Sequence, residues 1–391
     1  MKFEIHSKEL KTLLEKVMTV INKNAVLESL KQIHFKVDKH TLTLWGTDLE
    51  QFVIVNTKDI YNAEENTEVW NFAMSMEDVK VLTKMSNLIT LEQLDEHTLQ
   101  AQSGRKKVTI PLAEEDKDIT IPTVTEDAIL TVKENWLLET VTGMESFTSA
   151  DDSRPILQVF HFNTMENRVE VVDSYKLATR TLENKTIHSV QENPFKTVRL
   201  HSKCVPVFKK LLDKKSENAV DMTRNDKYVK VSGHNFTYIV RAVVGEFFKI
   251  NRVMQQENEY SIILDRENLK EIMKYNIDLI KTEKKEDRHG VVFYNKDEKL
   301  YSYAKTSRYT AFDEMVTTES TMNKDFGIRF NPMYWMDILN TIDTDVIRCE
   351  GRYSPVNGWM VTGKEYQFFV LPIHLGTTQE MIAEEMEKYL K

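Results

Sequence analysis

Two adjacent carboxylates, Asp151 and Asp152, stand shortly before Arg154 and form the strongest candidate in the chain for acid–base chemistry. A close pair of carboxylates can move a proton or hold a divalent cation. At the exit of a predicted helix, however, such a pair is more often a solvated cap. We therefore do not expect catalysis at this position.

The other residue patterns that catalysis or metal binding requires are missing from the sequence. It contains no glycine-rich phosphate loop, nucleophile elbow, His-Glu-x-x-His or EF-hand pattern, and its ten histidines are scattered. Cys204 and Cys349 stand far apart with no partner at metal-ligand spacing, which predicts two buried thiols and neither a disulfide nor a zinc site. We therefore expect no enzyme, no metal and no cofactor.

Lysines are concentrated in one predicted helix, at 202–215, whose net charge is +4. The six predicted helices sum to zero, so the remaining chain carries the whole net charge of −9. A lysine cluster is usually a solvated face, but helices of this kind can also face a polyanion. The predicted helices span 7–20, 75–86, 133–147, 202–215, 265–280 and 331–343.

A polar interruption at Asp173 divides the strand-like stretch "VEVVDSYKLATRTLE". The stretch "LTLWGTDLEQFVIV" has the same outline around Asp48, 125 residues earlier. A third candidate, at 300–314, has Thr306 or Ser307 where the aspartate would stand. This recurrence indicates that the elements positioning these residues belong to an internal repeat.

The chain contains three similar units of about 130 residues. Each unit opens with a strand that runs into an amphipathic helix, and a second strand–helix element follows in mid-unit. Late in each unit, a small residue followed by glycine marks a hairpin, where glycine suits a turn that needs positive φ. These glycines are Gly104, Gly233 and Gly363.

Each unit is expected to be an α+β domain with two helices and antiparallel sheets. Polar stretches between the units give domains at 1–126, 127–256 and 257–375, followed by a C-terminal helical extension at 376–391. A length of 391 residues also exceeds what one core usually organises. A single irregular α+β protein with accidental internal similarity is the alternative.

The composition is typical of a cytoplasmic protein without membrane contact. Apolar residues make up 41% and charged residues 29% of the chain, and no apolar run is long enough to span a bilayer. The N-terminus lacks the apolar region of a secretion signal. The net charge argues against a protein whose whole surface grips nucleic acid, but it leaves room for a local basic strip.

The three-unit arrangement resembles the beta subunit of bacterial DNA polymerase III, the replicative sliding clamp, in colinear order over residues 1–375. "KFEIHSKELKTLLEKV" and "LTLWGTDLE" resemble the first domain of that family, and "DDSRPILQVFHF" with "VEVVDSYKLA" resembles the second. "GEFFKINRVM" and "FFVLPIHL" are similar to later elements. The resemblance implies a non-catalytic processivity factor that encircles DNA and tethers DNA polymerase, the clamp loader and other proteins.

In the resembled family, the polar interruption forms one wall of a pocket for short linear peptide motifs. Apolar side chains there would surround one or two anchor residues, and Arg154 would orient the peptide. Without the resemblance, the apolar members would be interpreted as ordinary core. The resemblance places in the pocket Arg154, Leu157, Ser174, Tyr175, Lys176, Leu177, Phe248, Val253, Phe369, Leu371, Pro372, Ile373, His374 and Leu375.

The chain departs from the family pattern at several positions. Residues 174–176 replace Gly-His-Arg, Phe248 replaces proline and His374 replaces arginine, so a different peptide preference is expected. In the first domain, residues 24–25 replace Arg-Pro, which removes an expected DNA contact and leaves Lys23 beside it. These differences indicate a divergent clamp.

The resemblance further implies a homodimer, closed head to tail around double-stranded DNA and bound to it without sequence preference. For the dimer contact we expect the strand "RKKVTIPL" to pair with an edge strand near 299–304, although Val108 and Ile110 could equally be core of their own domain. The expected interface residues are Lys106, Val108, Ile110, Met273, Ile277 and Ile280. The residues expected to face DNA are Lys23, Asn24, Lys203, Lys209, Lys210, Lys214 and Lys215.

Two alternatives stay open at the level of sequence. One is a clamp-fold peptide-binding scaffold without a replicative DNA role, which the weak basic character of five of the six helices favours. The other is an enzyme that acts on nucleic acid or sugars through an unrecognised carboxylate pair. Retention of the protein on circular DNA, but not on linear DNA, would separate both from a clamp.

Residues 376–391 extend beyond the point where the resembled family normally stops. Thr377 with Glu380 forms a capping box, and apolar residues follow at helical spacing. We expect an amphipathic helix that packs beside the peptide pocket and competes with incoming motifs; packing on the third domain away from the pocket is the alternative. The apolar stripe consists of Ile382, Met386, Tyr389 and Leu390.

Overall fold

The computed structural model describes residues 1–63, 69–114, 119–125, 127–183, 185–187, 195–284, 290–373 and 379–390. The chain forms two compact units. Unit 1 comprises Met1–Val141 and Glu183–Val243, and unit 2 comprises Thr142–Leu182 and Val244–Lys391. Each unit thus combines one terminal repeat with part of the middle repeat, and the three-domain division stays a prediction from the repeat.

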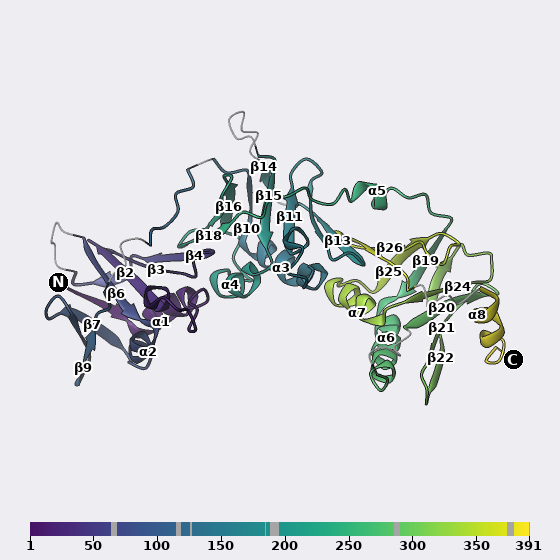
Figure 1. Cartoon of the computed structure of the whole chain (residues 1–391), viewed down its shortest axis with the longest axis horizontal. Helices are drawn as coiled ribbons and strands as arrows, with labels where there is room; N and C mark the ends of the chain where they lie inside the picture. Colours follow the sequence, from purple (N-terminus) through teal and green to yellow (C-terminus); the bar gives the residue numbers. More distant parts are fainter. Residues whose placement is uncertain are drawn as a thin grey trace. The chain divides into compact units, whose positions relative to one another are not determined.

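Unit 1 contains two antiparallel sheets (Figure 1). One has the order β5-β1-β7-β8-β9, and the other has the order β14-β10-β16-β17-β18-β4-β3-β2-β6. The strands are β1 (Lys2–His6), β2 (Gln32–Asp38), β3 (Thr41–Thr47), β4 (Gln51–Thr57), β5 (Ile60–Tyr61), β6 (Trp70–Ser75), β7 (Leu88–Gln93), β8 (Thr98–Ser103), β9 (Lys106–Pro111), β10 (Leu130–Lys133), β14 (Thr186–Ile187), β15 (Thr197–His201), β16 (Ala219–Arg224), β17 (Tyr228–Ser232) and β18 (Phe236–Arg241).

The helices that accompany these strands bury one apolar stripe each. In α1, the buried residues Leu10, Leu13, Leu14 and Val17 follow the helical period, so one face packs on the core while the lysines point outward. In α2, the Ser75 hydroxyl accepts a hydrogen bond from the backbone N–H of Asp78 and so caps the first turn. The helices are α1 (Ser7–Val17), α2 (Met76–Thr83), α3 (Glu134–Met144) and α4 (Cys204–Leu211), with a 3₁₀ turn η1 (Glu28–Lys31).

Unit 2 also contains two antiparallel sheets. One includes the order β11-β12-β13-β27-β26-β25-β19-β23, and the other has the order β22-β21-β20-β24. The strands are β11 (Val159–Asn163), β12 (Arg168–Val172), β13 (Lys176–Thr181), β19 (Tyr260–Asp265), β20 (Val291–Lys296), β21 (Lys299–Lys305), β22 (Thr310–Glu314), β23 (Thr317–Ser320), β24 (Phe326–Phe330), β25 (Val346–Gly351), β26 (Trp359–Gly363) and β27 (Tyr366–Val370).

The helices of unit 2 cover both faces of the smaller sheet. In Figure 1, α6 lies on one side of the strands β20 to β22, and α8 lies beside them on the opposite side. The core of this unit contains the fully buried aromatic side chains Phe293, Phe330, Trp335 and Trp359, whose rings contact one another edge to face except for the tilted pair Phe293–Trp335. The helices are α5 (Asn251–Met254), α6 (Arg266–Ile280), α7 (Pro332–Thr341) and α8 (Gln379–Met386), with 3₁₀ turns η2 (Glu145–Phe147) and η3 (Pro155–Leu157).

The lysine-rich helix α4 is shorter than the sequence predicts, because the buried Glu134 carboxylate binds the backbone where the helix would continue. Glu134 accepts hydrogen bonds from the backbone N–H of Asp213 at 2.7 Å and from the Ser216 hydroxyl at 2.6 Å. Leu212 is consequently extended, and the residues that follow form a turn. Lys214 and Lys215 therefore lie beyond the helix and not on its face.

The three hairpin glycines do not share one role, and the expected positive φ is wrong for two of them. Gly104 lies in a two-residue turn with a φ of +59°. Gly233 instead follows β17 directly and Gly363 ends β26, each immediately before such a turn. A Cβ on Gly233 would come within 2.2 Å of Phe236, and one on Gly363 within 2.7 Å of Ile342. Close approach of a side chain therefore explains these two glycines.

Candidate functional site

The polar interruption at Asp173 is a tight turn closed by its own carboxylate. Asp173 accepts hydrogen bonds at 2.9 Å from the backbone N–H groups of Tyr175 and Lys176. Ser174, between them, has a φ of 90°, a strained value that the surrounding bonds hold in place. Such an Asx turn fixes the point at which β13 starts.

The two equivalent positions of the repeat have the same turn. Asp48 accepts from the backbone N–H groups of Glu50 at 2.9 Å and Gln51 at 2.7 Å, immediately before β4. At the third position Thr306 takes this role, and its hydroxyl accepts from the backbone N–H groups of Arg308 and Tyr309 before β22. Threonine replaces aspartate with the weaker hydroxyl version of one turn.

Lys176 points away from the turn into the protein and is only 5% exposed. Its ammonium group pairs with Asp337 of α7 and lies 3.8 Å from the Asp173 carboxylate. The rings of Phe147 and Tyr334 each have their centroid 5.0 Å from the ammonium nitrogen. Burial raises the pKa of Asp173, against the lowering effect of its two backbone hydrogen bonds and of Lys176. Lys176 is therefore a structural residue and offers no charge to a peptide.

Arg154 joins the turn to the carboxylate pair considered above. Its Nη1 donates to the Ser174 hydroxyl at 3.0 Å, and its Nε donates to Asp151 at 3.0 Å. Hydrogen bonds from Ser153, together with Arg154, lower the pKa of Asp151. Asp152 accepts from Gln158 instead, so the two carboxylates have separate partners and do not share a proton.

Four members of the predicted pocket, Tyr175, Leu177, Phe369 and Leu371, lie on or directly beside the pairing of β13 with β27. Leu177 is directly opposite Phe369, and the backbone N–H of Leu371 donates to the carbonyl of Tyr175 at 2.9 Å. Leu177 and Phe369 are buried. Tyr175 is 58% exposed, and its ring stacks on Tyr334. Tyr175 is therefore the most accessible large apolar side chain of this group.

The remaining predicted members differ in exposure. Leu157, Val253, Pro372 and Ile373 are half-buried, and Phe248 is 49% exposed. His374 and Leu375 lie outside the described residues.

The buried aromatic residue of the segment "GEFFKINRVM" is one that the sequence did not single out. Phe247, immediately before Phe248, is buried and stacks on His161. No signal in the sequence distinguishes these two adjacent phenylalanines.

The residues predicted to face DNA are solvent-exposed, but two of them have acidic partners. Lys203 lies 3.6 Å from Glu50, and Lys210 lies 3.5 Å from Glu15. Exposed pairs of this kind contribute little to stability and exchange readily for other anions. Lys23, Asn24, Lys209, Lys214 and Lys215 are also exposed.

One part of the predicted dimer contact is wrong. The strand near 299–304 is β21, which pairs with β20 on one side and β22 on the other and therefore has no free edge. The edge strand of this sheet is β22. Three residues predicted to support the contact, Met273, Ile277 and Ile280, are buried on α6 within their own unit.

The other side of the predicted contact is an edge strand, β9. Ile110 is buried beneath it, Val108 is half-buried and Lys106 is exposed.

No other arrangement in the described part of the chain indicates chemistry. Its His, Cys, Asp and Glu side chains form no group of three or more that could hold a metal ion. Cys204 and Cys349 are buried, and burial raises the pKa of the Cys349 thiol. Among the described helices, none combines the length and the apolar character that crossing a membrane requires.

Comparisons with known proteins agree on one family. Residues 1–124 match the model of the DNA polymerase III beta subunit, N-terminal domain. The beta sliding clamp of Lactococcus lactis is 22% identical over 363 residues, which cover 89% of this chain and 91% of the relative. The beta sliding clamp of Haemophilus influenzae is also 22% identical and covers 89% of this chain and 92% of its own length.

Solved structures share the fold over nearly the whole chain. The DNA polymerase III beta chain of Streptococcus pneumoniae superposes with a TM-score of 0.83 at 16% identity and covers 95% of this chain and 99% of its own. The Helicobacter pylori beta clamp, solved with a DNA ligase peptide, gives a TM-score of 0.79 at 15% identity over 96% of this chain and all of its own. With the colinear motifs and the repeated turns, these matches make the chain similar over most of its length to the DNA polymerase III beta subunits, the beta sliding clamps.

Proposed function

We propose that the chain is a DNA sliding clamp, in which two copies close head to tail around duplex DNA and tether DNA polymerase and other proteins to it. It is a processivity factor of the cytoplasm and not an enzyme. The family and the fold support this proposal. The observation that carries it is a repeated strand pairing. The chain forms this pairing, or junction, twice within itself, between β4 and β18 and between β13 and β27. The two strands that would form a third such pairing, β22 and β9, are edge strands.

The two internal junctions have the same register. The strand after a polar turn, β4 or β13, pairs with the last strand of a hairpin, β18 or β27. Gln51 and Lys176, three residues after the turn residue, face Val240 and Val370 respectively. The equivalent strands of the third junction are β22, which follows the Thr306 turn, and β9, which ends the first hairpin.

The repeated register predicts how β22 of one copy meets β9 of another. Ser103 is the last paired residue before its hairpin turn, as are Gly233 and Gly363 before theirs. Counting from Ser103 and from Thr306 gives the expected pairing. It joins Tyr309 to Ile110, Thr310 to Thr109, Ala311 to Val108, Phe312 to Lys107, and Asp313 to Lys106.

The charges on the two edges are complementary in this register. At the second junction, Arg180 pairs with Glu365 at 2.9 Å, and both side chains are almost fully buried. The equivalent residues at the third junction are Asp313 and Arg105, which carry the same two charges in exchanged positions. In addition, Asp313 is directly opposite Lys106 in this register, and opposite charges directly across a strand pair stabilise it whereas like charges destabilise it.

The third junction lacks one hydrogen bond of the other two. The backbone N–H of Arg241 donates to Glu50, and that of Leu371 donates to Tyr175. The equivalent residue on β9 is Pro111, which has no N–H to donate. The contact between copies is therefore weaker at this end than the internal junctions, as a ring that must open to admit DNA requires.

A ring retains DNA by topology and needs only loose phosphate contacts. The exposed lysines of α4 and of the turn that follows it are suited to such contacts, because their acidic partners Glu15 and Glu50 are themselves exposed. Tight binding would prevent sliding.

For partner proteins we propose the surface around the Asp173 turn. Its accessible Tyr175 ring can pack against an apolar anchor, and Arg154 and Ser174 can orient a peptide backbone. The Helicobacter pylori clamp, which shares this fold, was solved with a DNA ligase peptide.

The proposal is tested by loading the purified protein on nicked circular DNA with a clamp loader and then linearising the circle. We expect retention on the circle and release after linearisation. The Asp313→Lys variant should be monomeric in sedimentation and fail to be retained, because a lysine would face Lys106. Adding Lys106→Asp should restore part of both properties. Glu319→Lys, which makes the same charge change on an exposed strand outside this edge, is the control.

Retention that survives linearisation would overturn encirclement. A monomeric protein that binds the ligase peptide but ignores both DNA forms would instead support the peptide-binding scaffold.

A further inference from the structure

The C-terminal helix α8 is fixed on the outer face of the β22-β21-β20-β24 sheet. At its start, the Gln379 amide exchanges two hydrogen bonds with the backbone of Gly327, at 2.8 and 2.7 Å. A Cβ on Gly327 would come within 2.7 Å of Ile382, so the helix lies directly on the strand. In the next turn, Lys305 of β21 pairs with Glu385 at 2.6 Å and lowers the pKa of that carboxyl.

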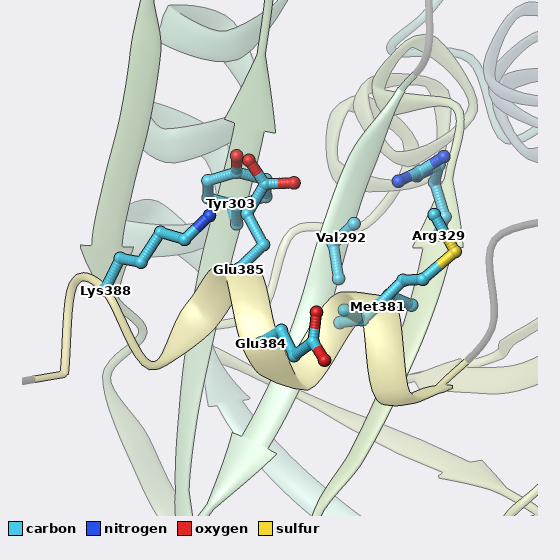
Figure 2. Close-up of a pocket in the computed structure, with 8 residues that line it drawn as sticks. Val292, Tyr303, Arg329, Met381, Glu384, Glu385 and Lys388 are labelled. Carbon is cyan, nitrogen blue, oxygen red and sulfur yellow. The ribbon is translucent and has the colours of Figure 1, made fainter.

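The helix meets the sheet unevenly along its length. Ile382 and Met386 pack among Val292, Tyr294, Tyr301 and Tyr303. Beside the first turns, a cavity of about 200 Å³ remains. In Figure 2, Met381 and Arg329 lie toward one end of this cavity, and Glu385, Tyr303 and Lys388 lie toward the other.

Beyond the helix, the chain reaches the edge of the sheet. Tyr389 stacks on Phe312 of β22, with ring centroids 5.7 Å apart and an interplanar angle of 18°. It also contacts Tyr303, and Phe312 in turn stacks on Tyr301. Leu390 packs against the same cluster. An aromatic platform thus extends from the helix to the edge strand.

We infer that this platform is part of the contact between two copies of the chain and receives Lys107 of the second copy. The inference rests on the proposed function, because the register derived above places Lys107 directly opposite Phe312. Residues directly opposite each other in an antiparallel pair lie on the same face, with Cβ atoms about 4.5–5.5 Å apart. Lys107 therefore lies next to Phe312, on the same face as the platform.

Lys107 has the orientation that this contact requires. Its neighbours Lys106 and Val108 pair with Ser103 and Ala101, which are buried on the core-facing side of the sheet. Lys107 consequently points to the solvent face, and it is exposed. On β22, Phe312 likewise belongs to the outer face that α8 covers. A lysine ammonium over stacked tyrosine and phenylalanine rings gains a cation–π interaction.

At the first internal junction, β4 with β18, the outer face is also covered by another segment of the chain. There, Phe52 of β4 and Ile239 of β18 are buried beneath Val124, which belongs to the segment that follows the first hairpin. After the third repeat, α8 and Tyr389 cover the outer face of β22. The C-terminal extension thereby holds an otherwise exposed edge strand in the shape that a second copy binds.

The inference is tested by measuring the dimer dissociation constant of the full chain by sedimentation at several concentrations. Tyr389→Ala and Lys107→Ala should each weaken the dimer about threefold to tenfold. The double variant should be little worse than either single variant, because both remove one interaction. Lys107→Arg should retain most of the affinity. Met381→Ala, an exposed apolar residue at the other end of the same helix, is the matched control.

A chain that ends at residue 375 should dimerise more weakly still, about tenfold or more, because Phe312 loses its support. Since this truncation also exposes the sheet, the inference is judged by the Tyr389 and Lys107 variants. Strictly additive effects of those two substitutions, or an unchanged dissociation constant for both, would overturn the inference. If the unaltered protein dimerises and Asp313→Lys abolishes the dimer, the proposed ring stands even when the inference fails.

Discussion

The two internal junctions, β4 with β18 and β13 with β27, share a turn and a register but differ in what their side chains do. On the inner face, the first is held by a neutral hydrogen bond, in which the hydroxyl of Tyr238 donates to Gln51 at 2.7 Å. The second places Lys176 at the position of Gln51 and pairs it with Asp337. Arg180, where the first junction has Val55, pairs with Glu365.

The outer faces differ as well. At the first junction, Val124 covers Phe52 and Ile239, and the surface is closed. At the second, the turn presents an exposed Tyr175 next to Arg154. The same strand pairing can therefore have a covered outer face, as at the first junction, or an exposed one that can bind a partner, as at the second. The side chains on that face decide which. At the second junction, the ion pairs Lys176–Asp337 and Arg180–Glu365 stabilise the strand pairing from the inner face, so the outer face need not be covered.

The largest effect is expected from converting the ionic inner face into the neutral one. Arg180→Val leaves the buried Glu365 carboxylate with only the exposed Lys364, 3.9 Å away, and should reduce the free energy of unfolding of unit 2 by about 3–5 kcal/mol. Urea denaturation of the full chain measures this loss. Adding Glu365→Asn, which gives the second junction the residues of the first, should recover more than half of it. A double variant no more stable than the single one would show that the two junctions are not interchangeable.

A smaller effect is expected at the outer faces, and only at one of them. Tyr175→Ala should weaken binding of the DNA ligase peptide about tenfold, because exposed aromatic residues are typical binding hot spots. Glu50 holds the equivalent position in the first turn, and Glu50→Ala should leave the affinity unchanged. Fluorescence anisotropy with the labelled peptide measures both. Equal losses in the two variants would contradict the assignment of the peptide site to the second junction.

The proposed junction between copies can be made more like the internal ones. Pro111→Ala supplies the missing N–H, and one added hydrogen bond contributes about 0.5–1.5 kcal/mol. The dimer dissociation constant should fall about twofold to tenfold, and spontaneous release from circular DNA should slow accordingly. Thr109→Ala, on the same strand, is the control. A dimer that is not tightened would mean that β9 does not pair in this register.

The sequence predicted the fold well, because the repeat reveals it. Each repeat opens with a strand that runs into a helix, and the apolar residues of α1 and α6 follow the helical period. Both patterns are local, so they can be recognised without knowing any long-range contact. Element ends were less predictable. The end of α4 depends on Glu134, which is 79 residues from Asp213 in sequence, so a local pattern could not reveal it.

The sites were predicted unevenly for the same reason. The turn at Asp173 is local, and the comparison with Asp48 identified it in sequence. Whether Lys176 is exposed or buried depends on Asp337, 161 residues away, and β21 is interior only because β22 pairs with it. Motif spacing cannot show which strand has a free edge, since this depends on the order of strands in the sheet.

The smallest predicted effect is a dependence of stability on pH at the Asp173 turn. Burial raises the pKa of Asp173 in the folded chain above its ordinary value of 3.8. Folding therefore favours the protonated carboxyl, and the stability contribution of this group declines as pH rises from about 3.8 through the raised pKa. Asp173→Asn keeps an oxygen that can accept the two backbone hydrogen bonds but does not titrate. The difference in unfolding free energy between the unaltered protein and this variant should therefore shift in favour of the variant as pH rises through that interval, and become constant above it. Urea denaturation at pH 4, 5, 6 and 7 measures the difference, and the contributions of all other titrating groups largely cancel in it. A difference that stays flat, or that shifts in favour of aspartate, would mean that the backbone hydrogen bonds and Lys176 outweigh the burial of this carboxylate.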